Sequence, residues 1–409
     1  MEQGGQRILL TDSQRFDWLR LTRSEGVGPR TFRALVNRYG GARAALEALP
    51  SLGARSGKTI VLCSVADAER EMAQAARIDA RFVALGERDY PAALAQIADP
   101  PPLIALRGAP AILARPAVSI VGSRNASALG LRMTEILAHG VGEHGYAIVS
   151  GLARGIDAKA HEAALATGTI AVLAGGHARI YPPENEPLAE AIIERGGAVL
   201  SEMPIGWTPR GRDFPRRNRI VSGLSLATVV VEAARKSGSL ITARFALDQG
   251  REVFAVPGSP LDPRAEGTND LIRQGASLAA DPDHIVSALA PLLPPEPQFD
   301  GLSANSPLAP RRKPLWDELD LPDLGADLAA PEFPGWEQAS EGPAPDLSPP
   351  DSKLLGALSV SPVDIDSLAR LVSLPVREVQ AALAELELAG RVTRDGLNRV
   401  SLPPEPRTR

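Results

Sequence analysis

Six short apolar runs, separated by stretches of helix length, constrain the fold of this chain more than any other feature of its sequence. They read VSIVG (118–122), YAIVSG (146–151), TIAVLAG (169–175), AVLSE (198–202), ATVVVEA (227–233) and EVFAVPG (252–258). Such continuous β-branched and apolar runs are typical of strands covered on both faces, and helices between them favour right-handed βαβ units. Residues 100–290 therefore predict an α/β domain with a Rossmann-like parallel sheet.

The remaining chain divides into three regions. Residues 1–99 are Ala-rich and helical in character, which predicts a separate helical domain. Residues 291–350 contain fourteen prolines among scattered acids, and we expect a disordered linker there. Residues 351–409 regain regular order as two helices around SLPV, followed by the hairpin RVTRDGLNRVSL. This order predicts a C-terminal winged helix.

The net charge of −5 argues against a nucleic-acid partner only until its distribution is considered. The 291–350 segment holds eleven acidic residues against three basic ones, which is more than the whole negative balance. The rest of the chain is slightly basic, so local charge decides the class of partner.

Several classes of protein and site are disfavoured by the composition. The chain has one cysteine, Cys63, which cannot form an internal disulfide and suits a reducing compartment. No apolar run reaches eighteen residues, and the first residues lack a signal-peptide pattern, so we expect a cytoplasmic protein without a membrane span.

The five histidines form no i, i+4 pair, and no metal site is expected. The pattern G-x-G-x-x-G is absent, and GARSGKT (53–59) has three residues between its glycines where a P-loop needs four, so no nucleotide cofactor is expected.

Glycine-rich loops follow the first two predicted strands, where backbone amides can point at an anion. The candidate residues of these loops are Gly122, Ser123, Arg124, Ser150, Gly151, Arg154 and Gly155. The alternative for the first loop is a plain tight turn. In the second loop Asp157 is interpreted as a helix N-cap, although Asp157, His161 and Glu162 also suggest acid–base chemistry. We expect no catalytic residue.

The segment TPRGRDFPRRNRIVSGLS (208–225) carries five arginines within ten residues, opposed only by Asp213. Arginines in a loop that leads into a helix neutralise phosphates and stack on bases, whereas the alternative is a solvated charged face. Base stacking would depend on few rings, of which Phe214, Trp207 and Tyr181 are nearest. A further loop, ahead of a predicted helix, offers amides and hydroxyls to an anion or merely caps that helix. The candidates in the two segments are Arg210, Arg212, Phe214, Arg216, Asn218, Arg219, Lys236, Ser237, Gly238 and Ser239.

SGLARGIDAKAH, TIAVLAGG, YPPEN, SEMPIG, FPRRNRIVSGLS, EAARKSGSLITARFAL, GREVFAVPG and EGTNDLIRQGA together resemble the DprA/Smf family, in order, over about residues 115–280. The resemblance implies single-stranded DNA binding, dimerisation, loading of the RecA recombinase during natural transformation, and no catalysis. By position, it implies that the Arg124 turn, the Ser150–Gly155 loop and the arginine segment form the DNA pocket. The chain departs from the family in GGHARIYP, with His177 and Arg179, and in Gly211, where a basic residue is common.

Other functions stay open on the sequence. A related fold cleaves nucleoside monophosphates through the pattern P-G-G-x-G-T-x-x-E, where this chain reads EAARKSGSLITA without the corresponding glutamate. A transcription regulator built around the winged helix is another alternative. For residues 1–99 the resemblance implies a SAM-like or helix-hairpin-helix-like domain. In SEGVGPRTFRAL a helix-hairpin-helix turn would offer the amides of Gly26 and Gly28 to a DNA phosphate, and the alternative is a helix-packing turn in a SAM-like bundle.

Overall fold

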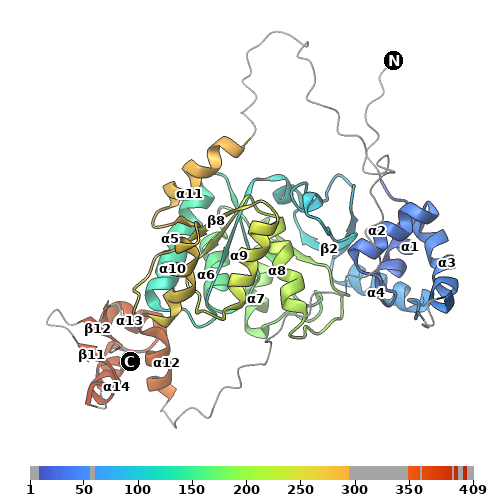
Figure 1. The fold of residues 1–409 in the computed structure, drawn as a ribbon. Coiled ribbons are helices and arrows are strands. Elements are labelled where there is room, and N and C mark those ends of the chain that lie inside the picture. Colours follow the sequence, from blue (N-terminus) through green and yellow to red (C-terminus); the bar gives the residue numbers. More distant parts are fainter. Residues whose placement is uncertain are drawn as a thin grey trace. The chain divides into compact units, whose positions relative to one another are not determined.

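The fold is described here from a computed structural model, which describes residues 9–55, 60–293, 349–359, 362–388, 391–394 and 399–402 (Figure 1). A central β-sheet has helices on both faces. Within the described residues this sheet has nine strands. From one edge to the other they are β1 (Arg81–Ala84), β2 (Leu103–Gly108), β6 (Ala198–Ser201), β5 (Thr169–Val172), β4 (Ala147–Ser150), β3 (Ala117–Val121), β7 (Ala227–Val230), β8 (Glu252–Ala255) and β9 (Ser277–Leu278).

The seven strands from β6 to β9 are parallel, and all six predicted apolar runs are found among them. The expectation of a Rossmann-like α/β core is thereby confirmed. The strand order grows outward from β3 in one direction and then restarts at β7 on its other side. Ligands of such sheets bind at this switch point, beyond the carboxyl ends of the strands.

Alternate residues of each strand enter different cores, as the two-residue period of a strand requires. In β3, Val118 and Ile120 pack beneath one helical layer, while Ala117 and Val121 pack beneath the other. The first layer consists of α5 (Ala128–Glu143), α6 (Ile156–Ala163), α7 (Glu186–Glu194) and α11 (Pro282–Leu289). The second layer consists of α8 (Asp213–Gly223), α9 (Gly238–Asp248) and α10 (Glu266–Arg273).

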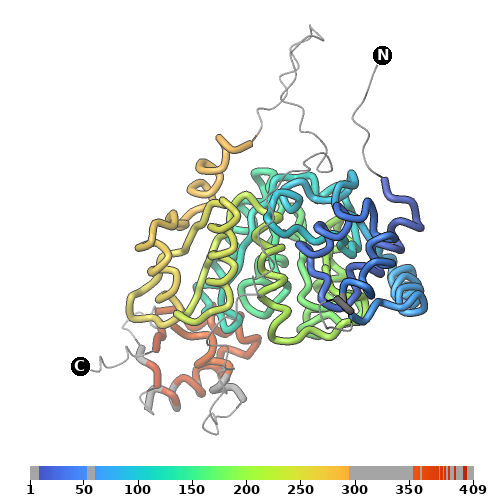
Figure 2. The backbone as a smooth tube through the Cα atoms, turned by 45° about the vertical axis from the view of Figure 1, so that its right-hand side comes forward, coloured from blue at the N-terminus to red at the C-terminus, as the bar shows by residue number. Residues whose placement is uncertain are grey.

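Four helices precede the sheet and pack around a core of their own (Figure 2). They are α1 (Asp12–Arg23), α2 (Pro29–Tyr39), α3 (Ala42–Arg55) and α4 (Val65–Arg77). Gly26 has φ +75° in the turn between α1 and α2, and Gly28 is the N-cap of α2. The segment expected to be helical up to residue 99 also contains a strand, because β1 pairs antiparallel with β2, and β2 with β6. Phe82 and Leu103 of these strands enter the helical core.

The C-terminal region has the predicted winged-helix elements. They are α12 (Pro349–Ala357), β10 (Val363–Asp364), α13 (Ile365–Val372), α14 (Val376–Leu388), β11 (Thr393–Arg394) and β12 (Arg399–Ser401). β12 pairs antiparallel with both β10 and β11, which gives the expected hairpin. Most of the segment expected to be a disordered linker lies outside the described residues, and the four-region division remains a proposal. No helix in the described part of the chain is long and apolar enough to cross a membrane.

Candidate nucleic-acid interface

The first turns of α8 are the meeting point of loops from the carboxyl edge of the sheet. Phe214 lies beside Arg124, which follows β3, and beside Tyr181, which follows β5. Further along α8, Arg217 lies on Gly151, which follows β4, and Asn218 donates to the carbonyl of Gly238 after β7. The structure therefore gathers at one helix most of the loops that the sequence singled out.

Arg124, Phe214 and Tyr181 form a cluster that we call the ring platform. The guanidinium carbon of Arg124 lies 4.9 Å from the centre of the Phe214 ring. The Tyr181 ring meets Phe214 edge-on, with centroids 6.0 Å apart and planes inclined by 70°. Arg124 is exposed and Tyr181 is half exposed, so both remain accessible from solvent. An exposed guanidinium beside aromatic rings can pair with a phosphate and stack on a base.

Arg217 connects α8, which carries Phe214, to the loop after β4. Its side chain is buried, and Nη1 lies 3.5 Å from Oδ2 of buried Asp157. The same carboxylate accepts hydrogen bonds from the amides of Gly151 and Ala153, at 3.1 and 3.4 Å. Burial lowers the pKa of Arg217, and the Asp157 charge opposes that effect. The pair thus ties α8 to the loop after β4.

Two interpretations change here. Asp157 is not the N-cap of α6: Gly155 holds that position, and Asp157 reaches back to amides of the preceding loop. Arg217 was not among the candidate site residues, although helical spacing could have singled it out. Residues 214, 217 and 218 lie on one face of a helix, while Arg216 points to solvent.

Arg219 is also buried and is engaged in an internal ion pair. Its Nη2 lies 2.7 Å from each carboxylate oxygen of Glu202. Its Nη1 donates to the carbonyl of Asp99 at 2.8 Å. The arginine segment is therefore not one exposed face. Arg210, Arg212 and Arg216 are exposed, whereas Arg217 and Arg219 are structural.

The loops after β3 and β4 contact each other closely. Gly155 has φ +71°, and a Cβ there would lie 2.3 Å from the carbonyl oxygen of Ser123. Ser150 is fully buried and donates to the carbonyl of Ile120, so its hydroxyl faces the sheet. Arg154 is exposed and pairs with exposed Glu184. Such surface pairs contribute little, and a phosphate can compete for the arginine.

The start of α9 is largely satisfied by its own residues. The Ser237 hydroxyl accepts from the amide of Ser239 at 3.3 Å and lies 2.6 Å from the Ser239 hydroxyl. The helix is therefore capped by its own residues, as in the alternative interpretation of this segment, but the N-cap is Ser237, while Ser239 lies in the first turn. Lys236 is exposed beside them, and it has no ion-pair partner among the described residues.

A carboxylate of the protein itself occupies the N-terminus of α5, the helix that follows β3. The Glu232 carboxylate, after β7, accepts from the amide and hydroxyl of Ser127 at 3.0 and 2.5 Å. Ser127 is the N-cap of α5, where a nucleotide phosphate sits in many Rossmann folds. A Cβ on Gly130 would lie 2.5 Å from this carboxylate, so the glycine leaves room for it. Burial raises the pKa of Glu232, while the bonds from Ser127 lower it.

The two buried histidines near the site are held neutral. Burial, reinforced by Arg217, lowers the pKa of His161 to about 3, and its Nδ1 lies 2.7 Å from the Thr169 hydroxyl. Burial lowers the pKa of His177 to about 4, and its Nε2 lies 3.1 Å from the carbonyl of Ala105. In the segment GGHARIYP, which departs from the family pattern, His177 is therefore buried against β2 inside the protein. No cluster of metal-binding side chains occurs among the residues described.

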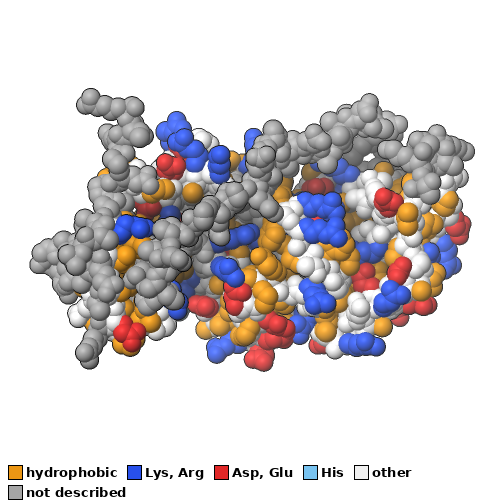
Figure 3. Space-filling model, turned by 90° about the horizontal axis from the view of Figure 1, so that it is seen from below, with side chains coloured by type: hydrophobic (Ala, Val, Ile, Leu, Met, Phe, Trp, Pro, Cys, Tyr) orange, Lys and Arg blue, Asp and Glu red, His pale blue; other side chains and the backbone are white. Residues whose placement is uncertain are grey.

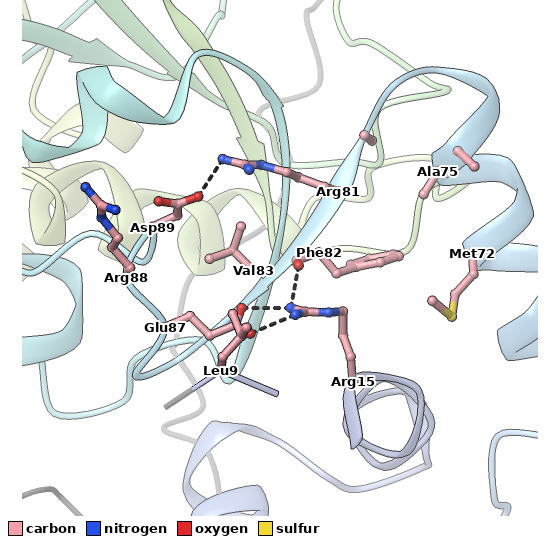
Figure 4. Close-up of a pocket in the computed structure, with 12 residues that line it drawn as sticks. Leu9, Arg15, Met72, Ala75, Arg81, Phe82, Val83, Glu87, Arg88 and Asp89 are labelled. Atoms are coloured by element: carbon pink, nitrogen blue, oxygen red, sulfur yellow. Dashed lines mark hydrogen bonds and ion pairs between the residues drawn. The ribbon is translucent and has the colours of Figure 1, made fainter. Parts of the chain in front are cut away.

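A cavity of about 580 Å³ lies apart from this interface, between α1, α4 and β1 (Figure 4). Arg15 spans it, pairing with Glu87 at 2.7 Å and donating to the carbonyl of Phe82 at 2.8 Å. The Glu87 carboxylate also accepts from the amide of Ala84. The side chains of Arg15 and Glu87 thereby bond backbone groups at the free edge of β1, and we assign them a structural role.

Charge alone does not outline a nucleic-acid surface. On the face shown in Figure 3, basic side chains alternate with acidic and apolar ones. The candidate interface is instead distinguished by Arg124 and Arg210, which lie next to rings and have no ion-pair partner in the part of the chain that the structure describes.

Comparisons with known proteins were made on the sequence and on the fold. The family described as DNA recombination-mediator protein A matches residues 81–290. A DprA-like N-terminal HHH domain matches residues 12–74, and a DprA winged helix domain matches residues 338–396. The pattern of the family therefore extends over half of the chain, with matching domains on both sides.

The sequences of two curated relatives align with most of this chain. Protein Smf of Synechocystis is 32% identical over 402 residues, covering 94% of this chain and 98% of the relative. Protein Smf of Escherichia coli is 40% identical over 303 residues, covering 74% and 72%. The crystal structure of DNA processing protein A from Streptococcus pneumoniae superimposes with a TM-score of 0.56 at 32% identity, covering 68% of this chain and 98% of that one.

Proposed function

Because the chain belongs to the DprA/Smf family, we propose that it binds and protects single-stranded DNA and loads the RecA recombinase onto it. The Streptococcus pneumoniae protein is named DNA processing protein A, which supports a role in DNA processing for this chain, and we propose that this role belongs to natural transformation. In this role the protein acts as a cytoplasmic homodimer and hands over its strand without breaking a covalent bond.

The ring platform is the observation that carries the DNA-binding part of this proposal. Bases of a single strand present free π-faces, and an aromatic side chain can stack on any of them. Duplex DNA keeps its bases stacked inside, so exposed rings favour single strands. Phe214, with Arg124 over it and Tyr181 at its edge, provides both the stacking surface and a charge for the backbone.

The exposed basic side chains around the platform supply phosphate contacts. Arg212, Arg216 and Lys236 are exposed and have no ion-pair partner among the described residues. Phosphate contacts position a strand without reading its sequence, so binding should tolerate any sequence. Buried Arg217 and Arg219, and the buried Ser150 hydroxyl, hold the loops rather than the DNA.

A titration of the purified protein with single-stranded DNA, duplex DNA and RNA of equal length tests the proposal. We expect tightest binding to single-stranded DNA, and an affinity that grows with its length. Preference for a palindromic duplex would instead indicate a regulator built around the winged helix.

The absence of catalysis is tested separately, with nucleoside monophosphates. Glu232, which follows β7, binds Ser127 at the start of α5, which argues against its attacking a ribose. We expect no release of free base. Release that disappears in Glu232→Gln would establish an enzyme in place of a DNA-binding protein.

A further inference from the structure

We propose that Trp207 and Arg210 form a second base-stacking subsite, next to the ring platform, which binds a neighbouring nucleotide of the same strand. The inference rests on the proposed function and extends it, because it assigns a binding role to an indole outside the platform. Its ligand is a nucleobase in a single strand, recognised by its π-face.

The Trp207 indole is held in place by a buried carboxylate. Its Nε1 donates to Oδ2 of Asp213 at 2.9 Å, and the backbone amide of Arg210 donates to the same oxygen at 2.9 Å. Asp213 is only 1% exposed, so this carboxylate is fixed. A ring that is already immobilised loses little entropy when a base stacks on it.

The backbone of Trp207 is equally constrained. Its carbonyl accepts from the amide of Gly176 at 2.9 Å. A Cβ on Gly175 would lie 2.9 Å from that carbonyl and 2.7 Å from Cδ of Pro209. The two glycines let the loop after β5 pack directly against the loop that carries Trp207, which fixes the backbone of Trp207.

Core packing does not account for the position of this indole. Trp207 is partly exposed and belongs to none of the apolar cores formed by the described residues, although Ile205, two residues earlier, is fully buried in one. A tryptophan usually gains much of its stabilisation from burial, so one fixed outside the core in an arginine-rich loop favours a ligand.

Arg210 supplies a planar cation on the same subsite. Its guanidinium carbon lies 4.7 Å from the centre of the Trp207 ring, and the side chain is exposed. Among the described residues no carboxylate pairs with it. An arginine stacked in this way can extend the stack to a base while it pairs with the adjoining phosphate.

The subsite is continuous with the platform through Asp213. The residue that anchors the indole directly precedes Phe214 in the chain and begins α8 with it. We therefore expect one strand that stacks on Phe214 to place an adjacent base on Trp207.

The test measures affinity for a thymidine oligomer and for an abasic oligomer of the same length, which keeps the phosphates and lacks the bases. Trp207→Ala should weaken binding to the thymidine oligomer about tenfold or more, a typical loss when a stacking ring is removed. It should change binding to the abasic oligomer by less than about twofold. Trp207→Phe keeps a stacking ring but loses the bond to Asp213, so it should recover part of the affinity for the thymidine oligomer that Trp207→Ala loses, and should match the unaltered protein on the abasic oligomer.

Arg210→Ala and Arg210→Lys provide a second pair that leaves the Asp213 anchor intact, because only the backbone amide of Arg210 bonds to it. Arg210→Lys keeps the charge without the planar stack. We expect it to lose affinity for the thymidine oligomer, and to keep its affinity for the abasic oligomer. Unfolding curves that match the unaltered protein establish that each variant is folded.

The outcomes separate this inference from the proposed function. Equal losses of Trp207→Ala on both oligomers, or no loss on either, overturn the subsite while single-stranded DNA binding stands. If the unaltered protein binds neither oligomer, the proposed function fails and the subsite fails with it.

Discussion

The guanidinium of Arg217 lies directly on Gly151: a Cβ at that glycine would be 0.9 Å from Nη1. Arg217 is buried on α8, and Gly151 opens the loop after β4, so the two segments approach as closely as a glycine permits. With Asp157 beside them, this contact fixes α8, and Phe214 on it, relative to the glycine loops.

Gly151→Ala should displace the Arg217 side chain and separate it from Asp157. Breaking a buried ion pair typically costs about 3–5 kcal/mol, and we expect unfolding free energy to fall by about 2 kcal/mol or more. Chemical denaturation measures this. Gly211→Ala is the matched control, since no atom lies within 4 Å of a Cβ there, and it should stay within about 0.5 kcal/mol. Equal stability of the two variants contradicts the contact.

Arg124→Ala and Arg216→Ala should weaken binding to single-stranded DNA of any sequence, because phosphate contacts carry no sequence information. Each lost contact should flatten the slope of log K against log salt concentration by about 0.7. Both side chains are exposed, so stability should hardly change.

Arg219→Ala provides the contrast. It leaves the largely buried carboxylate of Glu202 without its closest partner and should lower stability, whatever it does to DNA binding. If Arg219→Ala flattens the salt slope in a stably folded protein while Arg124→Ala does not, the division into exposed and structural arginines is wrong.

Acid should destabilise the protein through His161 and His177. In the folded protein the pKa of His161 is lowered from 6.5 to about 3 and that of His177 to about 4. Below pH 6.5 these two histidines therefore bind protons in the unfolded chain but not in the folded one. Stability is therefore full above about pH 6.5 and falls as the pH drops toward 4. His161→Asn should make the unfolding free energy less dependent on pH in this window. A dependence as steep as that of the unaltered protein would show that His161 is not responsible.

The sequence predicts the parallel sheet because each central strand is a continuous apolar run. β1 was missed, since four residues beside Ala-rich helices give no period to detect. The accessible part of the candidate site, exposed Arg124 and partly exposed Phe214, was also predictable from residue type and position. The roles of Arg217 and Arg219 were not, because their partners Asp157, Asp99 and Glu202 lie far away in the chain and are assembled only by the fold.

The winged helix should contribute little to single-stranded DNA affinity. Residues 351–409 carry eight basic and eight acidic side chains, and PVREVQAALAELELAG offers one arginine against three glutamates. Phosphates repel such a helix. The cores beneath the sheet's helices are built without it, so a chain lacking residues 300–409 should fold. Its affinity should lie within a few-fold of the full chain. A hundredfold loss, about 2.8 kcal/mol, would place the DNA on the winged helix.

Photo-crosslinking of single-stranded DNA to the full chain tests the central claim most directly. Iododeoxyuridine substituted along an oligonucleotide reacts with the aromatic side chains that its base stacks on, and mass spectrometry identifies the attached peptides. We predict crosslinks at Phe214 and Tyr181, strongly reduced in Arg124→Ala. Crosslinks confined to α1–α4 or to residues 351–409, with the ring platform unmodified, would contradict the account.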